Sequence, residues 1–351
     1  MSDYTNKKVY IILVNYNGWQ DTIECLESLY KIDYENYQVL VVDNDSSNNS
    51  LEYIKSWADG KTIIDEKDTT IYKKYVLPYI EKPKEYIEYN YLQALQGGDI
   101  ELEKKYQNPL ILIKSNKNGG FSYGNNIAIK YALKKNDFDY ILLLNNDTIV
   151  DKLFLKEMVN TAENVYNAGI TGSKIYYYNE PSKIWFNGGK YNNVSGRTVH
   201  IKKENKIAIS ECNFITGCSM LIKKILLKNV GLFDENYFMY LEDLDYCYQT
   251  IRSGYKLYIA HNSIIWHKIG SSGGGEISDF SAYWYYKNNI YFRKKNYKGF
   301  KYQSIVMIYL LMQFVSIIKW FFVRPSIIKQ LYKGTREGFK SENDFDYRVG
   351  K

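Results

Sequence analysis

The sequence has little cysteine and histidine, which excludes several kinds of site. Its 351 residues include four cysteines and three histidines. No two cysteines have C-x-x-C spacing, and no histidines have H-E-x-x-H or another zinc spacing, so a zinc site is not expected. The first apolar run is short and turns polar at Asn15, unlike a secretory leader. We therefore expect reduced thiols and a cytoplasmic protein.

Strong net charge and dinucleotide-type glycine motifs are lacking as well. The net charge is +7, too small to indicate nucleic acid by itself, and no RNA- or DNA-binding motif is present, so no nucleic acid partner is expected. The glycines of 117–126 read G-G-x-x-x-G rather than G-x-G-x-x-G, which disfavours a dehydrogenase. The stretch 56–62 ends like a P-loop, but Lys55 stands where its first glycine is required.

Short apolar runs alternate with helical spacing in the first 60 residues. Residues 9–17 and 37–50 start as apolar strands, while 21–32 and 51–58 have the periodicity of helices. This β-α-β-α order predicts an α/β fold, with a mostly parallel central sheet and helices on both faces.

Polar clusters follow three of the expected strands. They lie at 15–17, 43–45 and 145–147. In parallel sheets, ligands bind beyond the carboxyl ends of the strands. If the strands are neighbours, the clusters converge on one cleft.

Residues 61–108 interrupt the alternation and are rich in Tyr, Glu and Lys. We expect an inserted subdomain, helical over 86–96, that shapes acceptor binding or forms a homodimer contact. The remaining expected strands are at 110–116, 139–147, 173–189, 197–201 and 255–266, and the remaining expected helices are at 126–135 and 242–252. Residues 213–231 are expected to form a strand followed by a helix. The expected domains are a catalytic domain (1–60 and 109–290), the insertion (61–108) and a C-terminal helical segment (291–351).

The C-terminal segment is basic and then apolar. Much of the basic excess lies after residue 286, and residues 302–318 carry no charge. A spanning helix needs about 20 apolar residues, and Ser304, Gln313 and Ser316 interrupt this run. We expect an amphipathic helix on a membrane surface, at the inner face of the cell membrane. A helix docked on its own domain and a true span are the alternatives.

Asn145, Asn146 and Asp147 end an apolar run with amide and carboxylate oxygens. One carboxylate with neighbouring oxygens forms half of a Mg²⁺ or Mn²⁺ site, which substrate phosphates complete. The alternative is a plain turn, since Asn and Asp favour turns.

Three carboxylates, those of Glu242, Asp243 and Asp245, crowd at an expected helix start. Acids suit a helix N-terminus, but apolar neighbours also raise a carboxylate pKa and prepare a general base. Both roles stay open at this point. His267 precedes a Gly/Ser loop at 270–275 that has the composition of a lid; this histidine is a metal ligand, a phosphate donor or a structural residue.

Together these stretches resemble inverting family 2 glycosyltransferases with the GT-A (nucleotide-diphospho-sugar transferase) fold, and most closely rhamnosyltransferase-like members. The resemblance covers residues 8 to about 290 apart from the insertion. It rests on VNYNGWQDTIECLESL, VVDNDSSNNS, NKNGGFSYGNN, LLLNNDTIV, FITGCSMLIKK, FDENYFMYLEDLDYCYQTIRSGY and HKIGSS.

The resemblance implies roles for individual residues. Asp147 takes the last position of a D-x-D metal motif, in which Asn145 replaces the first carboxylate, and His267 reaches the metal or the diphosphate. Asp243 is the implied catalytic base, with Glu242 beside it. The residues implied at the donor nucleotide are Asn15, Asp43, Asn118, Gly120, Asn125 and Asn146. Those implied to face the acceptor or sugar are Trp185 and Gly217.

The implied reaction is a single displacement with a divalent metal, Mg²⁺ or Mn²⁺. A hexosyl group moves from a nucleotide-sugar donor, with dTDP-rhamnose as one candidate, to a glycan or lipid-linked acceptor in polysaccharide synthesis. One alternative is a sugar-phosphate nucleotidyltransferase, which would need a glycine-rich, basic loop where this chain reads VNYNGW. The other is a non-catalytic scaffold with a degenerate site.

Overall fold

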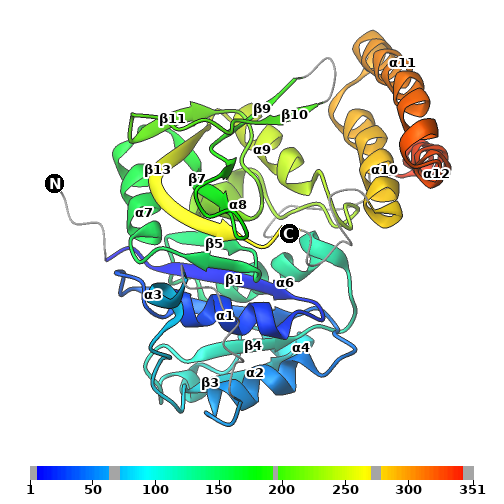
Figure 1. Cartoon of the computed structure of the whole chain (residues 1–351). Helices are drawn as coiled ribbons and strands as arrows, with labels where there is room; N and C mark the ends of the chain where they lie inside the picture. The colour runs from blue at the N-terminus through cyan, green and yellow to red at the C-terminus, as the bar shows by residue number, and fades with distance from the viewer. Residues whose placement is uncertain (1–5, 63–71, 193–196, 270–277, 343–351) are drawn as a thin grey trace.

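The structure is a computed structural model that describes residues 6–62, 72–192, 197–269 and 278–342. A twisted sheet lies at its centre, and three C-terminal helices stand at one side (Figure 1).

Most strands of the described residues belong to one large sheet. Its strands are β1 (Val9–Asn15), β2 (Tyr37–Asp43), β3 (Tyr86–Asn90), β4 (Leu110–Lys114), β5 (Tyr140–Leu144), β6 (Thr148–Val150), β7 (Ala168–Tyr177), β8 (Ile184–Phe186), β11 (Ile209–Cys212), β12 (Ser219–Lys223) and β13 (Lys256–His267). The order is β11-β13-β7-β12-β5-β1-β2-β4-β3, with β6 beside β13 and β8 beside β7. The strands β9 (Gly189–Tyr191) and β10 (Thr198–His200) pair separately.

The block β5-β1-β2-β4-β3 is parallel throughout. Its central strands are buried on both sides and are rich in Val, Ile and Leu, as expected of a sheet covered by helices. The other half mixes directions, because β12 runs antiparallel to both β5 and β7.

Helices cover the sheet in the order expected of an α/β fold. They are α1 (Trp19–Leu29), α2 (Ser50–Ala58), α3 (Lys73–Val76), α4 (Tyr91–Leu95), α5 (Ile100–Glu103), α6 (Gly120–Lys135), α7 (Phe154–Asn164), α8 (Lys224–Asn229), α9 (Glu242–Arg252), α10 (Asp279–Asn296), α11 (Gly299–Val323) and α12 (Ser326–Lys340). Helices α1 and α2 contact each other, while α6 packs against β1 and β2. Helix α1 connects β1 to β2, whereas α6 connects β4 back across the sheet to β5. Because these two crossovers run in opposite directions across the sheet, right-handed connections place α6 on the face opposite α1. The predicted α/β class is confirmed.

The segment 61–108 contributes an edge strand to the sheet. The helix expected over 86–96 is wrong in its first half, because residues 86–90 form β3 beside β4. Ile87 and Tyr89 are buried while Glu88 and Asn90 are exposed, the period of a half-buried strand. Asn90 then starts α4 with a capping box.

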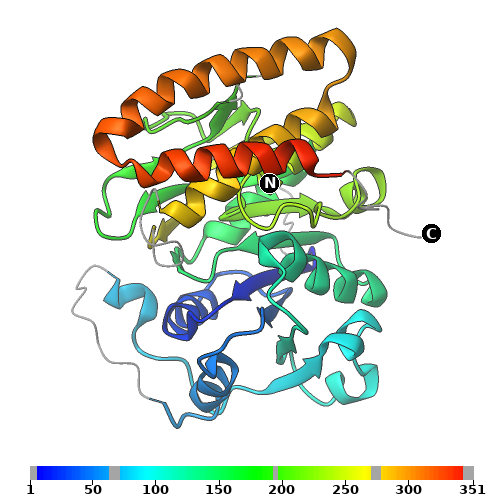
Figure 2. The ribbon, with the colours of Figure 1, turned by 90° about the vertical axis from the view of Figure 1, so that its right-hand side faces the viewer.

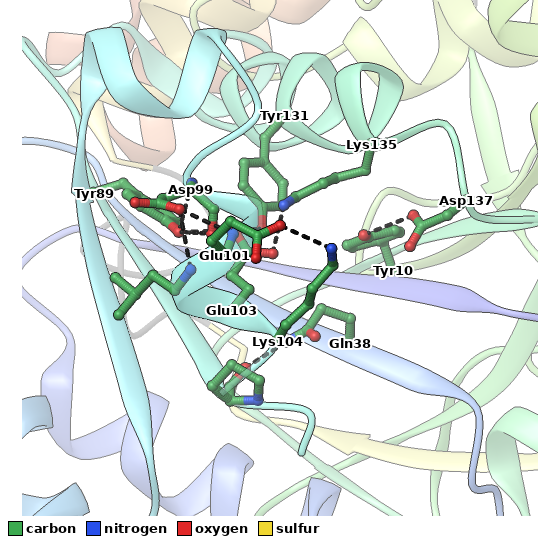
Figure 3. Close-up of polar contacts among 12 residues, drawn as sticks. Tyr10, Gln38, Tyr89, Asp99, Glu101, Glu103, Lys104, Tyr131, Lys135 and Asp137 are labelled. Carbon is green, nitrogen blue, oxygen red and sulfur yellow. Dashed lines mark hydrogen bonds and ion pairs between the residues drawn. The ribbon is translucent and has the colours of Figure 1, made fainter. Parts of the chain in front are cut away.

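Glu103 fastens the end of this segment to α6. Its Oε1 accepts hydrogen bonds from Tyr89 Oη at 2.8 Å and Tyr131 Oη at 2.9 Å. Its Oε2 lies 2.5 Å from Lys135 Nζ. Figure 3 shows these groups converging between α5 and α6. The segment 61–108 is therefore tied to α6 by partly buried charge.

The C-terminal helices begin earlier than predicted. The boundary at residue 290 lies inside α10, which starts with a capping box between Ser278 and Ser281. Figure 2 shows α11 doubling back into α12, and α12 packs along α10. Among the described residues, α11 is the one helix long and apolar enough to cross a membrane, and 22% of its apolar window is buried.

Candidate active site

Asn15 and Asp43 meet at the carboxyl ends of β1 and β2. The two strands are parallel and pair these residues directly. Asn15 Nδ2 donates to Asp43 Oδ1 at 2.7 Å, and the Ser46 N–H donates to Asp43 Oδ2 at 3.1 Å. Both side chains are buried. They form a hydrogen-bonded floor at the edge where parallel sheets bind ligands.

Asn146 joins this floor from the end of β5, on the other side of β1. Its Nδ2 donates to Thr22 Oγ1 at 2.8 Å and lies 3.5 Å from Asn15 Oδ1. Thr22 Oγ1 donates to the same Asn15 oxygen at 3.0 Å. The structure thus brings together three residues predicted at the donor. It adds Thr22, which the sequence analysis missed although it lies in the first turn of α1.

The loop before α6 is held against the segment that precedes α9. Gly120 has a φ of +81°, and a Cβ there would lie 1.9 Å from the Phe238 carbonyl oxygen. The Phe121 N–H donates to that oxygen at 2.9 Å. Asn44 Nδ2 donates to Asn118 Oδ1 and to the Gly120 carbonyl, both at 3.1 Å. Only glycine fits this close approach of two backbones.

Asn125 has different surroundings from the other predicted donor residues. Its side chain is buried, and its Nδ2 donates to the Phe121 carbonyl at 2.9 Å, within α6. A role at the nucleotide stays a prediction.

Asp147 faces His267 at another part of the same edge. Strands β6 and β13 pair Thr148 with His267. Because Asp147 directly precedes Thr148, this pairing brings the Asp147 side chain close to His267. Asp147 Oδ1 lies 3.0 Å from His267 Nε2, and Asn145 Nδ2 lies 3.2 Å from the same nitrogen. Burial opposes protonation of His267, but Asp147 and the Cys218 thiol outweigh it and raise the pKa of His267 well above its usual range.

The Asp147 and His267 pair offers two side chains to a divalent metal ion. A carboxylate oxygen is a ligand type that suits Mn²⁺, and the imidazole nitrogen of His267 could join it only after losing its proton. The described part of the chain holds no group of three or more His, Cys, Asp or Glu placed for a metal. The donor set therefore fits a divalent ion only if substrate oxygens complete it, which is the usual arrangement for Mg²⁺ at phosphates.

Asp243 is held at the start of α9 by backbone donors. The Gly217 N–H donates to Asp243 Oδ2 at 3.0 Å, and the Leu244 N–H donates to Oδ1 at 2.7 Å. Asp243 is partly exposed, whereas Glu242 is buried. Burial raises the pKa of Asp243. Burial and then the Asp243 charge raise the pKa of Glu242 well above its usual range.

The residues before α9 have a strained backbone. Tyr240 and Leu241 both have a φ of +70°, which costs a non-glycine residue about 1–3 kcal/mol. Asn288 of α10 stabilises this turn, since its Nδ2 donates to the Met239 and Tyr240 carbonyls at 2.8 and 2.9 Å. Such strain clusters at functional sites. The sequence signal for it was weak, because neither residue is a glycine or asparagine.

One turn before β12 joins the two carboxylate centres. Gly217 binds Asp243, and the carbonyl of the next residue, Cys218, accepts the Asn145 N–H at 2.9 Å. Strand β12 then runs antiparallel to β5, which ends just before Asn145. The turn therefore contacts both Asp243 and the start of the Asn145–Asp147 segment.

Trp185 lies beside this centre on β8. Its ring centroid is 5.0 Å from that of His267 and 5.1 Å from that of His200. The predicted Gly/Ser lid at 270–275 lies outside the described residues.

Comparison with known sequences gives a family match and two relatives. The Glycosyl transferase family 2 model matches residues 10–72 and 98–230. The low-salt glycan biosynthesis hexosyltransferase Agl10 of Haloferax volcanii is 25% identical over 144 residues, covering 40% of this chain and 46% of Agl10. The rhamnosyltransferase WbbL of Escherichia coli is 24% identical over 264 residues, covering 71% of this chain and 79% of WbbL.

Two solved structures share the fold. GalNAc-T7 with UDP, GalNAc and Mn²⁺ aligns with a TM-score of 0.56 and 14% identity, over 83% of this chain and 48% of that chain. The mannosyltransferase PcManGT of Pyrobaculum calidifontis with GDP-Man and Mn²⁺ aligns with a TM-score of 0.54 and 11% identity, over 95% and 87%. The matched region thus spans about half of Agl10 and of GalNAc-T7. The predicted GT-A fold is confirmed.

The arrangement combines three chemical capabilities at one sheet edge. It has a polar floor at β1 and β2, an acid and imidazole pair at β5 and β13, and a partly exposed carboxylate at α9. These suit the binding of a polar ligand, the neutralisation of anionic charge, and proton abstraction.

Proposed function

Because the chain belongs to glycosyl transferase family 2, we propose that it moves a hexosyl group from a nucleotide-diphosphate sugar to an acceptor hydroxyl, with inversion of the anomeric carbon. The observation that carries this proposal is the turn at Gly217 and Cys218. Its Gly217 N–H donates to Asp243, and its Cys218 carbonyl accepts the Asn145 N–H. A base and a leaving-group site on opposite sides of the donor sugar are what direct displacement needs.

Asp243 is the proposed general base. It accepts the proton of the acceptor hydroxyl while the acceptor oxygen bonds to the anomeric carbon and the bond from that carbon to the phosphate oxygen breaks. The N–H groups of Gly217 and Leu244 orient the carboxylate. Glu242 is the proposed neighbour that retains its proton, since its pKa is raised well above the usual range by burial and by Asp243.

The nucleotide is proposed to bind over Asn15, Asp43, Asn118 and Asn146, with Gly120 allowing close approach. The diphosphate would reach Asp147 and His267, which would hold a Mg²⁺ or Mn²⁺ ion together with phosphate oxygens. When bound, such an ion supplies charge neutralisation for the leaving diphosphate. Trp185 and Gly217 are proposed to face the transferred sugar or the acceptor.

The donor and acceptor are proposed from the relatives and the chain's C-terminal part. WbbL is a rhamnosyltransferase, which supports rhamnose as the sugar, and dTDP-rhamnose is the donor that we propose first. PcManGT is seen with GDP-Man, and GalNAc-T7 with UDP and GalNAc. We propose a glycan or lipid-linked acceptor in cell-surface polysaccharide synthesis, at the inner face of the membrane. The predicted homodimer contact at 61–108 remains a prediction.

The test is thermal stabilisation by dTDP, UDP and GDP, each with Mn²⁺, Mg²⁺ or EDTA. A ligand that binds only the native state raises Tm, and 100-fold excess over Kd contributes about 2.7 kcal/mol. We expect one nucleotide to raise Tm strongly and only with metal. A shift that persists in EDTA would remove Asp147 as a metal ligand. No shift with any nucleotide would favour the scaffold alternative.

A further inference from the structure

Helix α11 has two unlike faces. Ile305, Val306, Tyr309 and Gln313 are buried against the neighbouring helices. The opposite face carries Met307, Leu311, Phe314, Ile318, Phe321 and Phe322, which are 53–80% exposed. Their spacing of mostly three and four residues places them along one side of the helix. We refer to these six residues as the apolar stripe.

The apolar stripe continues into a groove beside α12. An open cavity of about 510 Å³ is lined by Met307, Leu311 and Phe314 of α11 and by Phe339 of α12. Arg336 precedes Phe339 by three residues and is exposed, so it lies on the same side of α12. Contiguous exposed apolar surface of this kind marks an interaction site.

Positive charge is concentrated in the same C-terminal helices. Residues 279–340 contain twelve Lys and Arg but only two acids, Asp279 and Glu337. Since the whole chain has a net charge of +7, the rest of the chain is net negative, and the basic excess belongs to these helices. Lys329, Lys333, Arg336 and Lys340 are exposed at helical spacing. We refer to these four as the basic stripe.

We propose that the apolar stripe and the basic stripe dock this protein on the anionic surface of a lipid bilayer, with α11 lying in the plane of the interface. Apolar rings enter the acyl boundary, and lysines and arginines bind the negative headgroups. Docking on the bilayer does not depend on which donor, sugar or metal the candidate active site binds.

The packing of α11 argues against a span. Gln313 Nε2 donates to Thr335 Oγ1 at 3.0 Å, and Trp320 Nε1 donates to Tyr286 Oη at 3.1 Å. These bonds fix α11 beside α12 and α10. Crossing the membrane would carry the basic stripe into hydrocarbon, which is costly.

Charge also disfavours a second copy of the chain on this face. A two-fold interface brings the same patch of both copies together, so basic stripes would meet. Both acids of the segment already have partners, because Asp279 lies 3.3 Å from Arg324 and Glu337 lies 3.3 Å from Lys340.

Docking would set the orientation of the candidate active site. Helix α10 contacts α12, and its Lys295 Nζ lies 2.6 Å from Asp245 of α9. Asn288 of α10 binds the backbone just before α9. The helices that meet the bilayer are therefore fastened to the helix that carries Asp243.

The test is cosedimentation of the full chain with vesicles of phosphatidylcholine alone or mixed with phosphatidylglycerol. We expect binding to the mixed vesicles that weakens with added salt. F314E/F321E and, separately, K333Q/R336Q should each lower the partition constant roughly tenfold or more. The matched controls are L92E and Y166E, which replace two apolar side chains outside the C-terminal helices that are 66% and 88% exposed. Both controls should bind the vesicles as the parent does.

Three results would overturn the proposal. They are no binding to either vesicle, equal binding by the stripe variants and the parent, and a lipid-free dimer mass that F314E/F321E abolishes. Circular dichroism and Tm of each variant would exclude unfolding as the cause. Nucleotide thermal shifts on the same preparations report the donor site independently, so failure of docking and failure of the proposed function are distinguishable.

Discussion

At the scale of single residues, adjacent carboxyl groups at the start of α9 have different surroundings. Glu242 Oε2 is buried and has no hydrogen-bond partner within the described residues. Asp243 accepts two backbone N–H bonds, which stabilise its charged form. Asp243 is therefore the one suited to give up and regain a proton.

We expect Asp243→Asn to lower kcat by about 10²–10⁴-fold, because it removes a general base. The amide has one acceptor oxygen, so it keeps only one of the two backbone N–H bonds that Asp243 accepts. The free energy of unfolding should therefore fall by about 0.5–1.5 kcal/mol, while donor affinity should stay near the parent value. Steady-state rates and calorimetric donor binding would measure the two effects. The matched control is Asp279→Asn, an acid paired with Arg324 at the start of α10, which should leave kcat unchanged. Unaltered turnover in Asp243→Asn would favour the scaffold alternative.

The pH dependence of turnover follows from the same carboxylate. Burial raises the pKa of Asp243 above the usual Asp value of about 3.9. Below this raised pKa the carboxyl group is protonated and cannot act as a base. We expect kcat/KM to fall as pH decreases through that raised pKa, and the residual rate of Asp243→Asn to lack this limb. A parent profile with no acid limb above the usual value would contradict the assignment.

Gly120 offers a second test at this scale. An added Cβ would meet the Phe238 carbonyl at 1.9 Å, so Gly120→Ala should displace the turn before α9 and lower activity at least roughly tenfold, equivalent to about 1.4 kcal/mol. Gly254→Ala is the control, since its φ of +87° is similar and nothing lies within 4 Å of the new Cβ. The control should lose only about 1–2 kcal/mol of stability, measured by urea unfolding, and keep its activity. An equal loss of activity in both variants would mean that the positive φ, and not the contact with Phe238, causes the loss.

At the scale of elements, Glu103 adds a polar contact between the segment 61–108 and α6, beside the pairing of β3 with β4. Glu103 of α5 binds two tyrosine hydroxyls and Lys135 of α6 (Figure 3). We expect Glu103→Ala to lower the free energy of unfolding by about 1.5–3 kcal/mol, since charged hydrogen bonds contribute that much and the two tyrosine partners stay buried. Urea unfolding would measure it.

The control for Glu103 lies in the same short helix. Glu101 pairs with Lys104 at 2.8 Å, but its side chain is 81% exposed, and exposed pairs contribute little. Glu101→Ala should change stability by less than about 0.5 kcal/mol. Similar losses in both variants would mean that helix propensity, not the buried cluster, sets the stability of α5.

At the scale of the whole molecule, Lys295 connects the C-terminal helices to the candidate active site. Its Nζ lies 2.6 Å from both Asp234 and Asp245, and all three side chains are at most 6% exposed. Lys295→Met should cost about 3–5 kcal/mol, because two carboxylates lose their buried cation. Thermal and urea unfolding would measure the loss.

The triple variant Lys295→Met, Asp234→Asn, Asp245→Asn separates charge from packing. Removing all three charges should recover much of the stability lost in Lys295→Met. No recovery would mean that the lysine stem, rather than its charge, holds α10 against α9.

The sequence predicted more of the sheet than of the connections. The expected strand at 255–266 and helix at 242–252 agree with β13 and α9 within about a residue, because their patterns are local. The helix expected over 86–96 is wrong in its first half. Residues 86–90 are too few for their sequence alone to distinguish a strand from one helical turn, and the neighbouring strand that decides it is not visible in the local pattern. The site residues themselves remain proposals, although the structure brings most of them to one edge.

The sequence alone determined the α/β class, the strand ends that carry polar groups, and the order of the family's motifs. These follow from periodicity, which reports which side of an element is buried. Only the tertiary structure decided that Asp147 faces His267, that Gly217 binds Asp243, and that α11 buries one face and exposes the other. Such contacts join residues far apart in the chain, and their geometry depends on how the whole sheet and its covering helices pack.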